Sequence, residues 1–258
     1  MASIAGGPRR VNNDDRFFLI GAYLMAAVLV GGFSLQFLAG RSRFDAPWFV
    51  HAHALIFFGW VVIYVAQTWL ATRGASALHR RLGWFATGWV VLMVVFGIAV
   101  TVALVRRGAV PFFFTPAYFL IMNPLSILTF AGLTAAAIVK RRETAWHRRL
   151  HFSGMAILLG PGLGRLLPLP LMIPHAGHAV FVGVILFPIA GVIADLRRTG
   201  RVHPGWWWGI ATITVMQIAM DVLAYGGPGG ALYAAITAGS PGASVAPLDY
   251  PPLPPPFR

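Results

Sequence analysis

Eight histidines are the side chains of this sequence best suited to bind a metal ion or a haem, because the chain contains no cysteine. All eight lie near the ends of long apolar runs, and none lies in the middle of one. They divide into an outer set and an inner set: His51, His53, His175 and His178, then His79, His147, His151 and His203. This distribution is typical of cofactor sites on both faces of a membrane, and equally of polar residues expelled to the two interfaces.

A repeated sequence word contains several histidines of the inner set. The chain reads "LHRRLGW" at 78–84 and, 68 residues later, "WHRRLHF" at 146–152, each time before an apolar run. A weaker third copy is "DLRRTGRVHPGWWWG" at 195–209. Taken singly, His79 and His147 are interpreted as interfacial residues whose neighbouring arginines hold lipid headgroups. The alternative hypothesis is that the word positions a histidine for a cofactor.

A b-type haem with two imidazole ligands needs one histidine from each of two helices. On the outer side the candidate ligands are His53 and His178. On the inner side they are His79 or His147 together with His151. A chain with these ligands would be a membrane redox protein that carries electrons between a quinol and an outer acceptor.

A copper or zinc site is the competing hypothesis for the outer histidines, since imidazole suits both metals. His51 and His53 are two residues apart, so a helix directs them to nearly opposite faces, whereas His175 and His178 are neighbours on one face. Up to four ligands would be available: His51, His53, His175 and His178. A chain without any cofactor stays a third possibility.

Arg165 is a charge inside an apolar run, where an unpaired charge is costly. Its expected partner is Asp221, near the outer end of the last apolar run. The functional alternative is that Arg165 holds an anion, a quinone or a haem propionate, as in a small-molecule or lipid transporter with a broken helix. A further alternative is a non-catalytic structural or assembly subunit of a larger membrane complex. The pattern predicts no catalytic residue.

The composition identifies an integral membrane protein. With 58% hydrophobic residues, 10% charged residues and a mean hydropathy of +0.73, 258 residues carry too little polar surface for a soluble globule. The net charge of +13 would favour nucleic acid in a soluble chain. Here the basic residues cluster in short turns between apolar runs, which favours the lipid bilayer as partner and no nucleic acid.

Apolar windows predict an all-α bundle of seven transmembrane helices, consisting of one leading span followed by three hairpin repeats. The expected membrane domain covers 17–225, after an amino-terminal segment at 1–16. The fifth span is expected to kink or unwind at its outer end, because it contains Pro161, Pro168 and Pro170. The expected spans are 17–39, 48–71, 83–105, 116–139, 150–172, 176–196 and 206–225.

Lysine and arginine are distributed 14 to 6 between the two sides of this topology. The positive-inside rule then places the amino terminus in the cytoplasm and the carboxyl terminus in the periplasm of a bacterial cytoplasmic membrane. The tail at 226–258 is rich in glycine and proline and is expected to be extended and disordered. The alternative is a strap on the outer face, or on a partner complex.

Four sequence segments together resemble a family of uncharacterised multi-span proteins from proteobacterial genomes. They are "HAHALIFFGWVVIYVAQTWLATRGASALHRRLGW", "KRRETAWHRRLHFSGM", "GPGLGR" and "DLRRTGRVHPGWWWG". The resemblance covers roughly 48–217 and implies a membrane bundle without an established activity. More distantly, histidines near both faces of a small bundle look like those of di-haem cytochrome b transmembrane proteins, a similarity that implies haem, although in those proteins the ligands lie well inside the spans.

Overall fold

The computed structural model describes residues 13–41 and 45–252, and every regular element in these two ranges is helical. Most of the expected amino-terminal segment, at 1–12, and the last residues of the tail, at 253–258, lie outside the described residues. The chain is an all-helical, multi-pass membrane protein.

Six of the helices are long and apolar enough to cross a membrane. They agree with six of the seven expected spans and extend several of them by a few residues. The largest extension is at the start of α3, which includes the whole first copy of the repeated word. The six helices are α1 (Asn13–Leu38), α2 (Trp48–Thr72), α3 (Ser76–Arg106), α4 (Pro116–Val139), α7 (Ala176–Thr199) and α8 (Pro204–Tyr225).

The fifth expected span is broken, as its prolines and glycines predict. The chain forms α5 (Thr144–Ile157), then α6 (Gly160–Leu166) with Pro161 in its first turn, then a short 3-10 helix η1 (Leu169–Met172). A proline lacks the N–H that continues a helix, and two more prolines flank and enter η1. Neither α5 nor α6 is among the six helices that are apolar enough to span by themselves.

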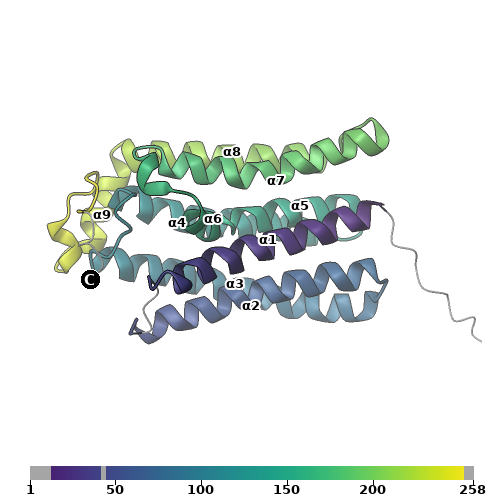
Figure 1. Cartoon of the computed structure of the whole chain (residues 1–258), viewed down its shortest axis with the longest axis horizontal. Coiled ribbons are helices and arrows are strands. Elements are labelled where there is room, and N and C mark those ends of the chain that lie inside the picture. Colours follow the sequence, from purple (N-terminus) through teal and green to yellow (C-terminus); the bar gives the residue numbers. More distant parts are fainter. Residues whose placement is uncertain (1–12, 42–44, 253–258) are drawn as a thin grey trace, which may run out of the picture.

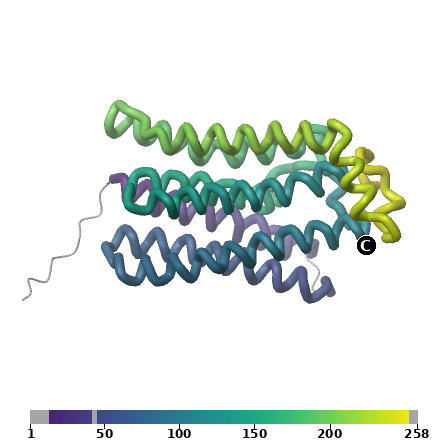
Figure 2. Tube along the Cα trace, turned by 180° about the vertical axis from the view of Figure 1, so that it is seen from behind, coloured from purple at the N-terminus to yellow at the C-terminus, as the bar shows by residue number. Residues whose placement is uncertain are grey.

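From α1 to α8, successive segments alternate in direction when α5 and α6 are taken as one segment, so that the connections lie at two opposite ends of the bundle (Figure 1). One end, here called the amino-terminal end, carries the start of α1 and the α2–α3, α4–α5 and α7–α8 turns. The opposite end, here called the carboxyl-terminal end, carries the other connections and the last residues of the described chain. Figure 2 shows the same arrangement from behind. Helix α5 begins at the amino-terminal end, and the chain after α6 reaches the other end, where α7 begins.

Large apolar side chains on the outer surface of the bundle are exposed, as a bilayer requires. Leu55, Val91 and Val215 are 74%, 61% and 64% exposed, on three different helices. The interior contains buried polar groups beside the apolar core, among them Arg149, Asp195 and the residues that surround them. The inside of the bundle is therefore where its polar chemistry lies.

Helices α1 and α6 cross at two glycines. A Cβ added to Gly32 would lie 2.6 Å from the carbonyl oxygen of Gly162, and one added to Gly162 would lie 2.9 Å from the carbonyl oxygen of Val28. Small residues permit such a backbone-to-backbone approach within a membrane bundle. This contact fixes the short α6 against the middle of α1.

The tail is folded, so the expectation of an extended, disordered end is wrong for 226–252. It forms α9 (Pro228–Thr237) and a 3-10 turn, η2 (Pro241–Ser244). The buried Tyr233 donates its hydroxyl hydrogen to the carbonyl of Gly242, 2.8 Å away, and the N–H of Ala117 donates to the carbonyl of Pro247, also at 2.8 Å. These residues fit the alternative expectation of a strap, because they pack on the carboxyl-terminal end of the chain's own bundle.

Candidate functional site

A buried ion pair joins α5 to α7 at the amino-terminal end. Arg149 donates to both oxygens of the Asp195 carboxylate, from Nε to Oδ2 at 3.2 Å and from Nη2 to Oδ1 and Oδ2 at 2.8 and 2.9 Å. The two side chains are only 7% and 5% exposed. Charge-assisted bonds of this kind are strong and directional, so they fix the two helices in one register.

The pair belongs to a larger group of charges, here called the arginine–aspartate network. Arg198 lies 3.0 Å from Asp195 and 2.7 Å from Asp14, while Arg148 pairs with Asp14 and lies 3.5 Å from Asp15. Among the residues that the structure describes, three positive and three negative charges of the network balance one another, which offsets the cost of removing them from water. The network contains Asp14, Asp15, Arg148, Arg149, Asp195 and Arg198.

Aromatic rings enclose this network. Trp206 of α8 is fully buried and donates its indole N–H to Oδ2 of Asp195 at 2.9 Å. Phe18 of α1 stacks on Trp206 with 5.8 Å between ring centres, and the guanidinium of Arg148 lies 4.8 Å from the centre of the Phe18 ring. Cations over aromatic faces are stabilised by the ring quadrupole, and more so where water is excluded. The network thus unites α1, α5, α7 and α8.

The two copies of the repeated word use their arginines differently. Arg80 and Arg81 are exposed, as headgroup-binding residues should be. Arg148 and Arg149 instead belong to the internal network, and Arg149 is 5% exposed. The interpretation of these two arginines as lipid anchors is therefore wrong. The word recurs, but only its histidine has the same role in both copies.

That shared role is a hydrogen bond back to the preceding helix. Nδ1 of His79, in the first turn of α3, lies 3.2 Å from the carbonyl oxygen of Gln67 in α2. Nδ1 of His147, in the first turn of α5, lies 2.8 Å from the carbonyl oxygen of Ala137 near the end of α4. A carbonyl only accepts, so each Nδ1 carries the hydrogen and each Nε2 presents a lone pair.

The structure brings the inner histidines together. The ring centres of His79 and His147 are 6.3 Å apart, with planes at 83°, and those of His147 and His151 are 4.8 Å apart. The rings come from α3 and α5, both of which pack on α4. His203 lies apart from them, with its ring 5.2 Å from that of Trp146.

His203 caps α8, because its Nδ1 accepts a hydrogen bond from the N–H of Gly205 at 3.0 Å. Its own backbone N–H donates to Asp195 at 3.2 Å, which connects the third copy of the word to the arginine–aspartate network. Partial burial, and then the positive charge of Arg149, lower the pKa of His203. The neutral ring that the cap requires is thereby favoured.

The outer histidines are separated by the fold. His175 and His178 are neighbours, with ring centres 5.9 Å apart, and Nε2 of His178 lies 3.2 Å from Asp221 of α8. His53 stacks on Phe57 within α2, 4.1 Å between centres, and its buried Nδ1 has no hydrogen-bond partner. Helix α2 packs on α1 and α3, whereas α7 packs on α5, α6 and α8. The haem ligand pair of His53 and His178 stays a prediction.

His51 and His53 do not form a four-histidine group with His175 and His178. His51 lies in the first turn of α2, on the same helix as His53 and away from α7. Within residues 13–41 and 45–252, no group of three or more histidine, cysteine, aspartate or glutamate side chains is placed to hold a metal ion. The copper or zinc site at the outer face stays a prediction.

Arg165 and Asp221 do not pair, so that expectation is wrong. The Arg165 guanidinium lies 3.9 Å from the centre of the Phe33 ring and donates to the carbonyl of Pro161 at 2.8 Å. Asp221 instead accepts hydrogen bonds from Gln217, at 3.2 Å to each oxygen, besides its contact with His178. Binding of an anion, a quinone or a haem propionate by Arg165 stays a prediction.

Comparison with known proteins adds no relative: no protein-family model, curated protein or solved structure matches this chain. The resemblance to multi-span proteobacterial proteins and to di-haem cytochromes therefore stays a prediction, and the site is argued from its geometry alone.

Sequence reasoning missed the residues that complete the arginine–aspartate network. Asp14, Asp195 and Trp206 were not among the candidate residues, although the chain has only seven acidic side chains. Asp195 follows a long apolar run and directly precedes "LRR", and a carboxylate at that depth needs a partner. Matching the few acidic residues to the arginines of the repeated word would have suggested that Asp195 pairs with Arg149.

Proposed function

We propose that this chain is a membrane redox protein that binds a b-type haem between His79 and His147 at its amino-terminal end. The observation that carries the proposal is the 6.3 Å separation of the two ring centres. Two imidazoles that bound one metal ion would have ring centres up to about 6.2 Å apart, from two bonds of roughly 2.0 Å and about 1.1 Å from each nitrogen to its ring centre.

The surroundings of the two rings support the same proposal. His79 and His147 come from different helices, as bis-imidazole ligation requires. Each uses Nδ1 to hold a backbone carbonyl, which leaves Nε2 as the available ligand and fixes the ring orientation. Metal-ligating histidines are oriented by this kind of outer hydrogen bond.

A bound haem would supply one-electron chemistry, whereas the chain's own residues hold and orient it. The carbonyls of Gln67 and Ala137 maintain the ligating tautomers of the two histidines. His151 stands beside His147 as a further imidazole at the same end of the bundle. The outer pair, His53 and His178, does not belong to this proposal, because their helices, α2 and α7, pack on different neighbours.

We also propose that the chain crosses a bacterial cytoplasmic membrane seven times, with its amino-terminal end in the cytoplasm. The broken segment α5–α6 runs between the two ends of the bundle, which supports seven crossings (Figure 1). Arg73, Arg141 and Arg201 are examples of the basic residues in the turns at the amino-terminal end. At the opposite end the described basic residues are fewer, namely Arg41, Arg106, Arg107 and Arg165.

The haem proposal is tested by the visible spectrum of the purified protein, oxidised and reduced, with iron measured on the same sample. We expect a reduced band pair of a b-type haem at one haem per chain. The variants His79→Ala and His147→Ala should each lose this low-spin spectrum, and added imidazole should restore part of it. His175→Ala, on the exposed carboxyl-terminal end, is the matched control and should keep the spectrum.

A colourless, iron-free protein that also fails to take up added haemin would overturn the proposal. So would a His147→Ala variant with an unchanged spectrum. Because both histidines also bind backbone carbonyls, the thermal unfolding of each variant must be recorded in parallel. A variant that keeps its melting temperature but loses the spectrum assigns the histidine as a ligand.

The topology is tested with single cysteines, since the natural chain has none. Ser76→Cys lies in the α2–α3 turn and Ser240→Cys in the tail, at opposite ends of the bundle. Seven crossings with a cytoplasmic amino terminus predict that an impermeant thiol reagent labels only Ser240→Cys from outside. Protection of both positions would mean that the segment α5–α6 does not cross.

A further inference from the structure

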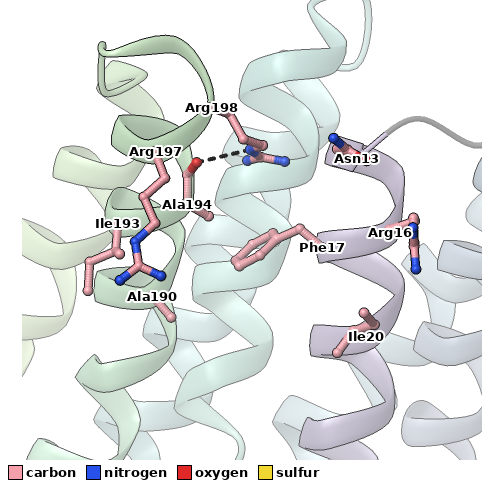
Figure 3. Close-up of a pocket in the computed structure, with 9 residues that line it drawn as sticks. All are labelled: Asn13, Arg16, Phe17, Ile20, Ala190, Ile193, Ala194, Arg197 and Arg198. Carbon is pink, nitrogen blue, oxygen red and sulfur yellow. Dashed lines mark hydrogen bonds between the residues drawn. The ribbon is translucent and has the colours of Figure 1, made fainter.

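A groove between α1 and α7 combines an apolar wall with arginines that form no ion pair within the described part of the chain. It lies at the amino-terminal end and has a volume of about 670 Å³ (Figure 3). Phe17 of α1 reaches across it toward α7. Its lining is formed by two stretches of helix surface, namely Asn13, Arg16, Phe17, Ile20, Ala190, Ile193, Ala194, Arg197 and Arg198.

The three arginines of the groove have different partners. Arg198 is held by Asp14, Asp195 and the carbonyl of Ala194, so its charge is already compensated. Arg16 and Arg197 are exposed, and neither forms an ion pair with a residue of the described ranges. Arg16 lies in the first turn of α1 and Arg197 in the last turn of α7, so both charges stand at the same level of the bundle.

An apolar slot continues from the groove toward the middle of the bundle. Its walls include Leu24 of α1 and Leu186 of α7, each 55% exposed, and Phe152 of α5 is also part of its lining. Along α7, the 11 residues from Leu186 to Arg197 span about 16 Å at 1.5 Å per residue. This length is close to half of the roughly 30 Å hydrocarbon core of a bilayer.

We infer that this groove is a binding site for an anionic phospholipid, with its headgroup at the end of the groove that Arg16 and Arg197 line and one acyl chain in the slot. The positive charges complement the phosphate, and the slot and the groove together extend along α7 over about the length of one leaflet. Basic pockets between transmembrane helices are known to select anionic headgroups, with each arginine near the surface contributing roughly 5-fold in affinity. A neutral lipid would fill the slot but gain nothing from the arginines.

The test is native mass spectrometry of the full chain in detergent, titrated with dioleoyl phosphatidylglycerol and, separately, with dioleoyl phosphatidylcholine. We expect one phosphatidylglycerol retained per chain, and about 30-fold weaker retention in the double variant Arg16→Gln/Arg197→Gln. The matched control is Arg141→Gln/Arg142→Gln, which removes the same charge from an exposed turn at the same end and should stay within about 2-fold of the natural chain.

Equal loss in the two double variants, or none in either, would overturn the site, because binding would then be general attraction to a basic surface. The acyl slot is tested separately by Ala190→Trp, which fills an exposed wall position and leaves both arginines in place. Ala190→Trp should weaken the retention of phosphatidylglycerol. In the natural chain, inorganic phosphate should not displace the bound phosphatidylglycerol. Unchanged retention in Ala190→Trp, or displacement by phosphate, would replace the lipid with a simple phosphate site.

Discussion

The carboxylate of Asp195 accepts a hydrogen bond from the indole of Trp206, 2.9 Å away, on the side chain that also binds the Arg149 guanidinium. One carboxylate therefore connects α5, α7 and α8 inside the bundle. Such a group cannot lose its charge without leaving a buried arginine uncompensated.

Replacing Asp195 with asparagine should strongly destabilise the protein. The substitution keeps the shape but removes the charge that Arg149 and Arg198 require, and breaking a buried pair costs about 3–5 kcal/mol. Thermal unfolding in detergent should show a clear fall in melting temperature for Asp195→Asn. The matched control is Glu143→Gln, which breaks the exposed ion pair with Lys140 and should change stability by at most about 1 kcal/mol.

If Asp195→Asn and Glu143→Gln unfold at the same temperature, the arginine–aspartate network does not stabilise the fold. The comparison is fair because both substitutions remove one negative charge at the same end of the bundle. It also separates the effect of burial from the effect of net charge.

Gly162→Ala should destabilise the crossing of α1 and α6. The added methyl group would lie 2.9 Å from the carbonyl oxygen of Val28 and 3.0 Å from Cα of Leu29, so the backbones must separate. Overpacking of this kind costs about 1–3 kcal/mol. Gly132→Ala in α4 is the control, since an added Cβ there meets nothing within 4 Å. Equal melting temperatures for the two variants would contradict the close contact.

The sequence predicted the helices well because apolar runs and their breaks are local signals. Six spans were expected near their observed positions, and the prolines of the fifth predicted its interruption. The repeated word also predicted that His79 and His147 lie at the same end of the bundle. Its 68-residue period repeats the hairpin, so both words fall at the same end of the bundle.

Partner choice between distant helices was not predictable in the same way. Arg149 pairs across 46 positions with Asp195, and Arg148 across 133 positions with Asp15, separations that no local period encodes. The expected pair of Arg165 with Asp221 failed for the same reason, because Phe33, Gln217 and His178 offered nearer partners. The tail was misjudged because its composition is poor in apolar residues, whereas its order comes from packing on the bundle.

The stability of the protein should fall with acid partly through His203. The folded site lowers the pKa of this ring below 6.5, so the unfolded chain binds the proton more readily. The contribution is present above about pH 6.5 and is lost as the pH falls below that value. Protonation also removes the Nδ1 lone pair that accepts from Gly205.

His203→Asn isolates this effect, because asparagine is a good helix cap that does not titrate. Between about pH 7.5 and pH 5.5, the melting temperature of the natural chain should fall further than that of His203→Asn. Parallel curves for the two proteins would mean that other groups account for the acid sensitivity.

Removing the Tyr233 side chain should release the tail. Tyr233 is 2% exposed and bonds the carbonyl of Gly242, and deleting a buried aromatic ring costs about 3–5 kcal/mol. Limited proteolysis with a broad-specificity protease should cleave Tyr233→Ala after α8 while the bundle stays intact. Tyr225→Ala, at the more exposed end of α8, is the comparison, and similar cleavage of both would show that Tyr233 does not hold the tail.

The polarity of α5 also imposes an order on biogenesis. This helix carries Arg148 and Arg149 into the bundle and, at 14 residues, is not among the helices that are long and apolar enough to cross a membrane. When the ribosome has just completed α5, the aspartates of α1 are available to it, but Asp195 emerges 46 residues after Arg149. We expect α5 to wait at the translocon, or beside α1, until α7 arrives, so that a later helix completes the insertion of an earlier one.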